Sequence, residues 1–168
     1  LDMEMAFASQ DDVFTVLEKV LPPIFAKYGR YHQASAAPFR RIPYLEAMEV
    51  YGSDKPDLRI DLKADDVTKL MEGCGFAPFE GQTVKAVKVS DYSGTRKQIE
   101  KICADAEVVS GNKVYWFRLD EKGEIVGGIA KFLQERKEQV IEALHLTPNT
   151  LVTLAAGKLG VRCSASIT

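Results

Sequence analysis

The first seven residues alternate between apolar and polar side chains. The apolar residues share one face, and Asp2 and Glu4 lie on the other. A period of two is typical of a β-strand, because successive side chains of a strand point to opposite faces. We therefore expect residues 1–7 to form a strand with one apolar face and one acidic face.

A helical pattern follows. Ser9 precedes two aspartates, and such residues are favoured at a helix N-terminus because their oxygens accept hydrogen bonds from free N–H groups. Apolar residues at helical spacing then continue toward Gly29, which we expect to end the helix. Pro22 and Pro23 should interrupt or kink it, because neither residue can donate a backbone hydrogen bond.

The rest of the chain combines short strands with short helices. Thr95 and Gln98 have the spacing of a capping box and predict that a helix begins there. The other predicted helices are residues 45–51, 65–71 and 134–144, and a loop is predicted over residues 32–38. The predicted strands are residues 58–62, 83–89, 113–119, 127–133 and 151–155. Without a regular βαβ order, this pattern indicates the α+β class, with a compact mixed sheet and packed helices.

Composition and charge exclude several classes of protein. The chain has 168 residues, 46% of them hydrophobic and 27% charged, which suits one domain with flanking pieces. Its net charge of −2 argues against a dedicated nucleic-acid binder, because such proteins usually carry a basic excess. No apolar run approaches the ~18 residues that span a bilayer, and no signal-peptide pattern is visible. We expect a cytoplasmic protein with no membrane partner.

The thiols and imidazoles do not form a metal-binding pattern. Cys74, Cys103 and Cys163 are far apart, and His32 and His145 each stand alone. An odd number of separated cysteines predicts reduced thiols in a cytoplasmic protein, and neither a disulfide framework nor a zinc site. We therefore expect no metal site within this chain.

Charged and aromatic residues give candidates for binding that each have a simpler explanation. Asp2 and Glu4 could hold an ammonium group or a divalent cation, but a solvated strand face explains them more simply. The aromatic residues 115–117 could stack bases, but alternation divides them between two faces and favours core packing. Four basic residues could contact RNA phosphates, and a solvated surface explains them equally well. These residues are Arg40, Arg41, Lys55 and Arg59.

Two neighbouring stretches resemble a known family. Residues 39–48 read FRRIPYLEAM, and residues 51–59 read YGSDKPDLR. Together they resemble the segment of bacterial-type aspartyl-tRNA synthetases that precedes an inserted domain. Residues 1–7 are similar to the strand that closes the second signature motif of these class II enzymes. Residues 95–99 and 130–133 look like landmarks of the insertion, which is a GAD domain.

The resemblance implies that the chain is an internal segment of a longer enzyme. Residues 1–57 would belong to the catalytic core, as a strand, a helix and a linker. Residues 58–156 would form the GAD-like insertion, and residues 157–168 would return toward the core. The tail after Gly157 matches the family poorly, so the resemblance assigns no residue roles there.

The resemblance also implies a two-step ligase. The parent enzyme would activate aspartate with ATP and Mg²⁺ and then transfer it to the terminal adenosine of tRNA. Asp2 matches the residue that faces the α-ammonium group of aspartate, and Glu4 would support it from the same face. The family's ATP-binding residues belong to parts of the fold outside this chain, so we expect no catalytic residue here and no activity from the chain alone. The parent is expected to be a homodimer.

Two functions from different classes remain open. The chain is either part of the ligase, with an insertion that supports the core or contacts the tRNA acceptor end, or a freestanding, non-catalytic GAD-type module that binds tRNA or protein. The strand predicted at residues 1–7 favours the ligase, because a self-contained module would not need a strand of a catalytic core. The sequence leaves open whether the parent also charges asparagine tRNA.

Overall fold

The computed structural model describes residues 2–157. The chain forms two compact units, Leu1–Ile42 and Pro43–Thr168, which are described one at a time. Cys163 and the predicted return segment after Gly157 lie outside the described residues. Within the described part, no helix is long and apolar enough to cross a membrane.

The start of the first unit differs from the prediction. Residues 2–8 form an irregular, solvent-exposed segment with a turn at Ala6 and Phe7, so the predicted strand at residues 1–7 is wrong for this structure. Its alternating pattern is real, but a strand is stable only when a neighbour pairs its backbone groups. The described residues of this unit contain no other strand to pair with it.

Helix α1 (Gln10–Tyr28) is the main element of the first unit, and it confirms the predicted start and end. Ser9 and Asp12 form a capping box, and the N–H of Gly29 donates to the Phe25 carbonyl at the other end. The helix runs through Pro22 and Pro23, so the predicted interruption is wrong. The helix has no buried residue, and solvent can therefore satisfy the carbonyls that lose their donors to proline.

The second unit begins with a helical segment that confirms the predicted helix at residues 45–51. A turn of α-helix, α2 (Tyr44–Glu46), continues into a π-helical turn (Ala47–Tyr51) and ends at Gly52, whose φ of 67° is left-handed. Glycine has no Cβ to oppose this conformation, which is why it commonly ends helices.

The next stretch corrects a second strand prediction. Residues 58–62 form a turn and an irregular segment, in which Leu58 and Ile60 are 47% and 43% exposed. The N–H of Ile60 donates to the Asp57 carbonyl, which closes the turn. The first strand is instead β1 (Ala64–Asp66), so the helix predicted from residue 65 begins only at α3 (Thr68–Met71).

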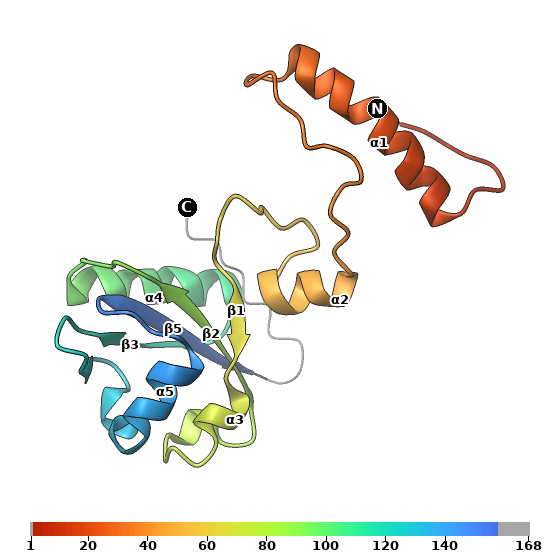
Figure 1. Ribbon diagram of the computed structural model, residues 1–168. Helices are drawn as coiled ribbons and strands as arrows, with labels where there is room; N and C mark the ends of the chain where they lie inside the picture. The colour runs from red at the N-terminus through yellow and green to blue at the C-terminus, as the bar shows by residue number, and fades with distance from the viewer. Residues whose placement is uncertain (1, 158–168) are drawn as a thin grey trace. The chain divides into compact units, whose positions relative to one another are not determined.

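A five-stranded antiparallel sheet in the order β1-β2-β5-β3-β4 forms the centre of this unit (Figure 1). The other strands are β2 (Thr83–Val89), β3 (Val114–Leu119), β4 (Ile125–Val126) and β5 (Thr150–Gly157). These bounds confirm three of the predicted strands to within two residues. With the helices that cover it, this sheet confirms the α+β class.

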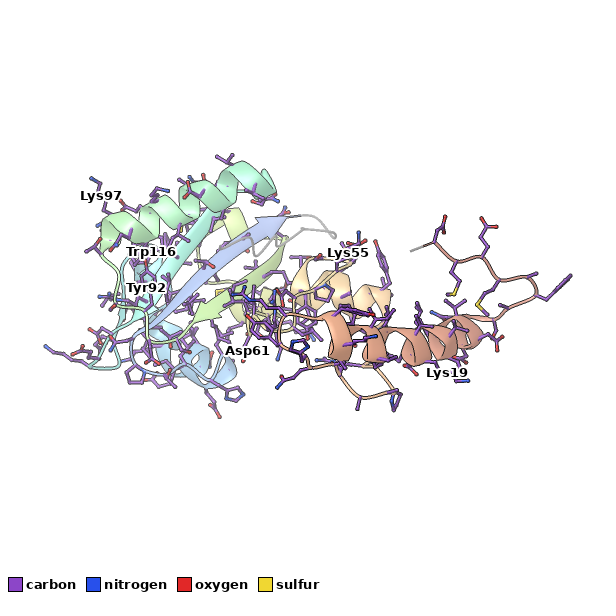
Figure 2. The ribbon with its side chains drawn as sticks, turned by 90° about the horizontal axis from the view of Figure 1, so that it is seen from above. Lys19, Lys55, Asp61, Tyr92, Lys97 and Trp116 are labelled. Carbon is purple, nitrogen blue, oxygen red and sulfur yellow. The ribbon has the colours of Figure 1, made fainter. Side chains whose placement is uncertain are left out.

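Helices cover both faces of the sheet, as Figure 1 shows. On one face, α3 and α5 (Lys137–Ala143) contribute to the main core, which is centred on Phe117, Val152 and Leu154. On the other face, α4 (Arg96–Ser110) buries Ile99 and Cys103 against Leu151 of β5. Trp116 and Tyr92 pack on this α4 side, and both are labelled in Figure 2. The capping box of Thr95 and Gln98 opens α4 as predicted.

The segment predicted as a strand over residues 127–133 folds as a turn and a 3-10 helix. Gly127 and Gly128 have positive φ, and the 3-10 helix Ala130–Phe132 follows them. A Cβ on Gly128 would overlap the carbonyl oxygen of Trp116, so this close approach requires glycine. The remaining helical turns are Ala77–Phe79, within the predicted glycine-rich loop, and Gln134–Arg136, which leads into α5.

Candidate functional site

The predicted aspartate-binding residues lie in the irregular segment before α1. Asp2 and Glu4 are both exposed, and neither belongs to a described strand. The structure therefore places two accessible carboxylates in this segment. Their assignment to the ammonium group of aspartate stays a prediction.

Arg41 is the centre of a cluster that fixes the end of the first unit to α1. Its guanidinium forms an ion pair with Glu18 and lies 4.2 Å from the centre of the Phe14 ring. Glu18 also accepts a hydrogen bond of 2.8 Å from the backbone N–H of Phe39. These contacts occupy the guanidinium, so the observed role of Arg41 is to hold the loop against the helix.

The ion pair gives a testable pH dependence. The hydrogen bond from Arg41, and then the one from the Phe39 N–H, hold the pKa of Glu18 below its usual value. Because the folded-state pKa is depressed, the contact stabilises the unit at pH values above the usual carboxyl pKa and is lost as the pH falls through the lowered value. We expect Arg41→Gln to raise the pKa of Glu18 in a carboxyl NMR titration. Arg30→Gln removes the same charge elsewhere and serves as the matched control. An equal rise of the Glu18 pKa in both variants would contradict a specific contact between Arg41 and Glu18.

The other predicted RNA-contacting residues lie on exposed loops. The Nε of Arg59 donates to Asp57 at 2.8 Å, and hydrogen bonds from the Arg59 side chain and N–H lower the pKa of Asp57 to about 2. The Lys55 side chain is exposed, and its backbone N–H bonds Ser53. Arg40 is exposed next to the Arg41 cluster. Arg40 and Arg41 belong to the first unit, and Lys55 and Arg59 belong to the second.

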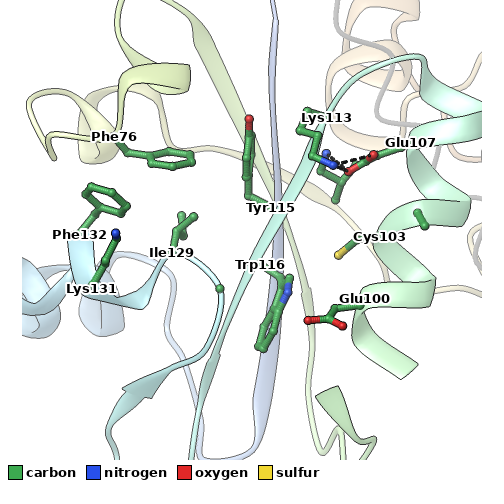
Figure 3. A pocket seen from close by; sticks show the side chains of 13 residues that line it. Phe76, Glu100, Cys103, Glu107, Lys113, Tyr115, Trp116, Ile129, Lys131 and Phe132 are labelled. Atoms are coloured by element: carbon green, nitrogen blue, oxygen red, sulfur yellow. Dashed lines mark hydrogen bonds and ion pairs between the residues drawn. The ribbon is translucent and has the colours of Figure 1, made fainter. Parts of the chain in front are cut away.

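A cavity of about 550 Å³ lies at the edge of β3 in the second unit (Figure 3). On the α4 side, Trp116 faces Cys103 and Glu100. Lys113 closes one end by pairing with Glu107 at 2.8 Å. Glu100 is held by Arg96 at 2.7 Å, so the carboxylates on this wall are both neutralised by partners.

Aromatic rings form the opposite wall of this cavity. The centre of the Phe76 ring lies 4.8 Å from that of Tyr115 and 4.9 Å from that of Phe132. The Nζ of Lys131 lies 4.7 Å from the centre of the Phe132 ring, and Ile129 lies between these rings and β3 (Figure 3). Pockets of this size, mostly apolar with a few polar groups, are the usual form of a binding site.

The cavity is suited to binding and not to nucleophilic chemistry. Burial, and then the negative charge of Glu107, raise the pKa of the Cys103 thiol to about 11, so the thiol stays protonated and weakly nucleophilic near neutral pH. Within residues 2–157, no group of three His, Cys, Asp or Glu side chains could hold a metal ion.

The sequence named the aromatic residues 115–117 but not this cavity. Alternation divides them as predicted: Phe117 and Tyr115 pack on the main core, whereas Trp116 packs toward α4. The cavity also needs Phe76, Lys131 and Phe132, which reach it from distant segments. No local sequence pattern predicts that these segments meet, because their meeting depends on the order of the strands in the sheet.

Comparisons with known proteins find similarity over most of the chain. A family model described as tRNA synthetases class II (D, K and N) matches residues 1–147. The chain is 41% identical over 160 residues to an aspartate–tRNA ligase of Streptomyces avermitilis, and 38% identical over 159 residues to an aspartate–tRNA(Asp) ligase of Deinococcus radiodurans. Each match covers 94% of this chain but only 27% of the relative. The chain therefore spans about a quarter of the length of these curated relatives.

Proposed function

Since the chain belongs to the class II tRNA synthetases of the D, K and N group, we propose that it forms part of an aspartate–tRNA ligase. One observation carries the proposal: 94% of the chain aligns at 41% identity with a relative of that name. The parent enzyme would activate aspartate with ATP and transfer the aspartyl group to tRNA. We further propose that it acts in the cytoplasm as a homodimer.

Asp2 is the residue of this chain that we assign to substrate binding. Its carboxylate would make a charge-assisted hydrogen bond to the α-ammonium group of aspartate, with Glu4 beside it. The segment that carries both residues is irregular and exposed in this structure. A neighbouring strand elsewhere in the ligase would pair the backbone of residues 2–7 and fix both carboxylates on one face.

ATP and Mg²⁺ belong to other parts of the proposed ligase. Among the described residues, no group of three His, Cys, Asp or Glu side chains could hold a metal ion. When bound, Mg²⁺ would neutralise charge on the phosphates of ATP. The contribution of this chain is therefore to position aspartate and to carry the GAD-like domain, residues 58–156.

We propose that this domain supports the catalytic core or touches the acceptor end of tRNA weakly. Net charge is −2, and several cations are already paired with carboxylates. Lys85 pairs with Asp66 at 3.2 Å, and Lys88 pairs with Asp65 at 3.0 Å. These pairs reduce the positive charge that this domain offers to phosphates, so any affinity for RNA should be low and sensitive to salt.

The second candidate, a freestanding GAD-type module without a catalytic role, is favoured by one observation. The second unit buries its own core on both faces of its sheet, which is what an independently folding module requires. The family membership of residues 1–147 extends across the first unit as well and favours the ligase.

We expect the isolated chain to show no aspartate-dependent exchange of pyrophosphate into ATP. The family's ATP-binding residues lie outside this chain by the resemblance, and they are the groups that would stabilise the charge that develops on the phosphates. A longer protein that contains these residues should catalyse the exchange with aspartate and not with lysine. Exchange by the isolated chain above a buffer blank would refute the first expectation, and failure of the longer protein would refute the ligase assignment.

A further inference from the structure

The outer edge of β3 is only partly paired. Val114–Leu119 pairs along its whole length with β5, whereas β4 pairs only with Arg118 and Leu119. The hydrogen bond from the Ile129 N–H to the Trp116 carbonyl shows that the backbone groups of Trp116 point away from β5. Because this direction alternates along a strand, the groups of Val114 also point outward.

Two hydrogen bonds from outside the sheet satisfy backbone groups at the ends of this open edge. At one end, the carboxylate of Glu107 accepts a 3.1 Å hydrogen bond from the Val114 N–H, in the position that a carbonyl of a neighbouring strand would take. At the other end, the Ile129 N–H bonds the Trp116 carbonyl at 3.0 Å. Between them, the Val114 carbonyl and the Trp116 N–H have no hydrogen-bond partner among residues 2–157.

The cavity lies over this uncovered stretch. Val114, Tyr115 and Trp116 all line it, and its two walls lie on opposite sides of β3 (Figure 3). A strand placed along the edge would direct alternate side chains to these walls. One set would meet Trp116 and Cys103, and the other would meet the rings of Phe76 and Phe132.

We propose that this edge of β3 binds one extended peptide segment of a protein partner by strand addition. The peptide donates an N–H to the Val114 carbonyl and accepts from the Trp116 N–H. Its side chains fill the two walls of the cavity. Strand addition takes its affinity from main-chain hydrogen bonds and its specificity from pockets for alternate side chains, and both features are present here.

The charges of the cavity select an acidic side chain on the peptide. Glu107 is paired with Lys113, and Glu100 with Arg96. Lys131 contacts the Phe132 ring and has no carboxylate partner among the residues that the structure describes. It is therefore the cation available to a peptide carboxylate. The proposal does not depend on the ligase assignment, because it uses only contacts within the second unit.

The test uses the full 168-residue chain and a blocked octapeptide of alternating valine and threonine with one central glutamate. We expect binding to shift the backbone amide resonance of Trp116 and to change its fluorescence, since Trp116 is the only tryptophan. Lys131→Glu should weaken binding by about tenfold, in proportion to the loss of one charge-assisted contact. Lys97→Glu makes the same charge change at an exposed site on α4 that does not line this cavity, and should leave binding unchanged.

Backbone recognition is tested separately with two N-methylated peptides. One peptide is methylated on its odd-numbered amides, and the other on its even-numbered amides. Only one of these two sets of amides directs its N–H groups toward β3, so one peptide should lose about tenfold in affinity. Equal binding of both methylated peptides would overturn strand addition. The absence of any response at Trp116 to millimolar peptide would overturn the proposal, as would a response there to adenosine monophosphate but not to peptide.

Discussion

Replacing Phe117 by alanine is expected to lower the free energy of unfolding of the second unit by about 3–5 kcal/mol. Phe117 is fully buried in the main core, on the central part of β3. The substitution removes the apolar surface of the ring and leaves a cavity between the sheet and the helices. The rigid pairing of β3 with β5 limits how far the surroundings can close that cavity.

Urea unfolding followed by Trp116 fluorescence measures this effect. Val108→Ala is the control, because Val108 is a large apolar residue of α4 that is 86% exposed. A surface substitution of this kind should change stability by less than about 0.5 kcal/mol. If the two variants unfold at the same urea concentration, the core described around Phe117 is not the one that stabilises the unit.

Asp2→Ala should weaken the binding of aspartate to the longer ligase by roughly ten- to hundredfold. The proposed interaction is charge-assisted, and its loss corresponds to about 1.5–3 kcal/mol. The KM for aspartate should rise much more than the KM for ATP, because Asp2 is assigned only to the ammonium group of the amino acid.

Glu4→Ala is the matched control for this variant, since both carboxylates lie in the same exposed segment. Glu4→Ala should raise the KM for aspartate less than Asp2→Ala does, because Glu4 is assigned a supporting position and no direct contact with substrate. An unchanged KM for aspartate in Asp2→Ala would remove the assigned role. Equal increases in the KM for aspartate in both variants would indicate a general effect of negative charge in this segment.

The elements that the sequence predicted well are those specified by neighbouring residues. The helix start at Ser9, predicted from the aspartates that follow it, and the capping box of Thr95 with Gln98 each depend on residues within one helical turn. Both are therefore visible in any short window. The strands β2 and β5 also combine local β-propensity with turn signals on both sides. For these elements, the local preference agrees with the final fold.

The errors arose where distant segments decide the outcome. Leu58 and Ile60 alternate as in a strand, but a turn closed by Asp57 removes them from the sheet. Gly127 and Gly128 adopt positive φ against Trp116, which a local pattern cannot reveal. Residues 2–7 have a strand pattern, but the described residues of their own unit contain no strand that could pair with them.

The candidate sites show the same limit. The pairing of Arg41 with Glu18 joins residues that are 23 positions apart, so sequence reasoning could name Arg41 but not its partner. The sequence predicts Trp116 as one of three candidate aromatic residues, whereas its position at an open strand edge follows only from the order β5-β3-β4. Composition identifies the chemistry that is available, and topology determines which groups meet.

The central position of β5 has a consequence for how the protein is made on the ribosome. β2 and β3 do not touch in the finished sheet, because β5 lies between them and pairs with both. A nascent chain that has emerged only as far as α5 can therefore pair β1 with β2 and β3 with β4, and the edges of β2 and β3 that later meet β5 stay unpaired. Synthesis of Thr150–Gly157 then supplies the strand that joins them, so assembly of this sheet is completed after translation of its last strand and not progressively along the chain.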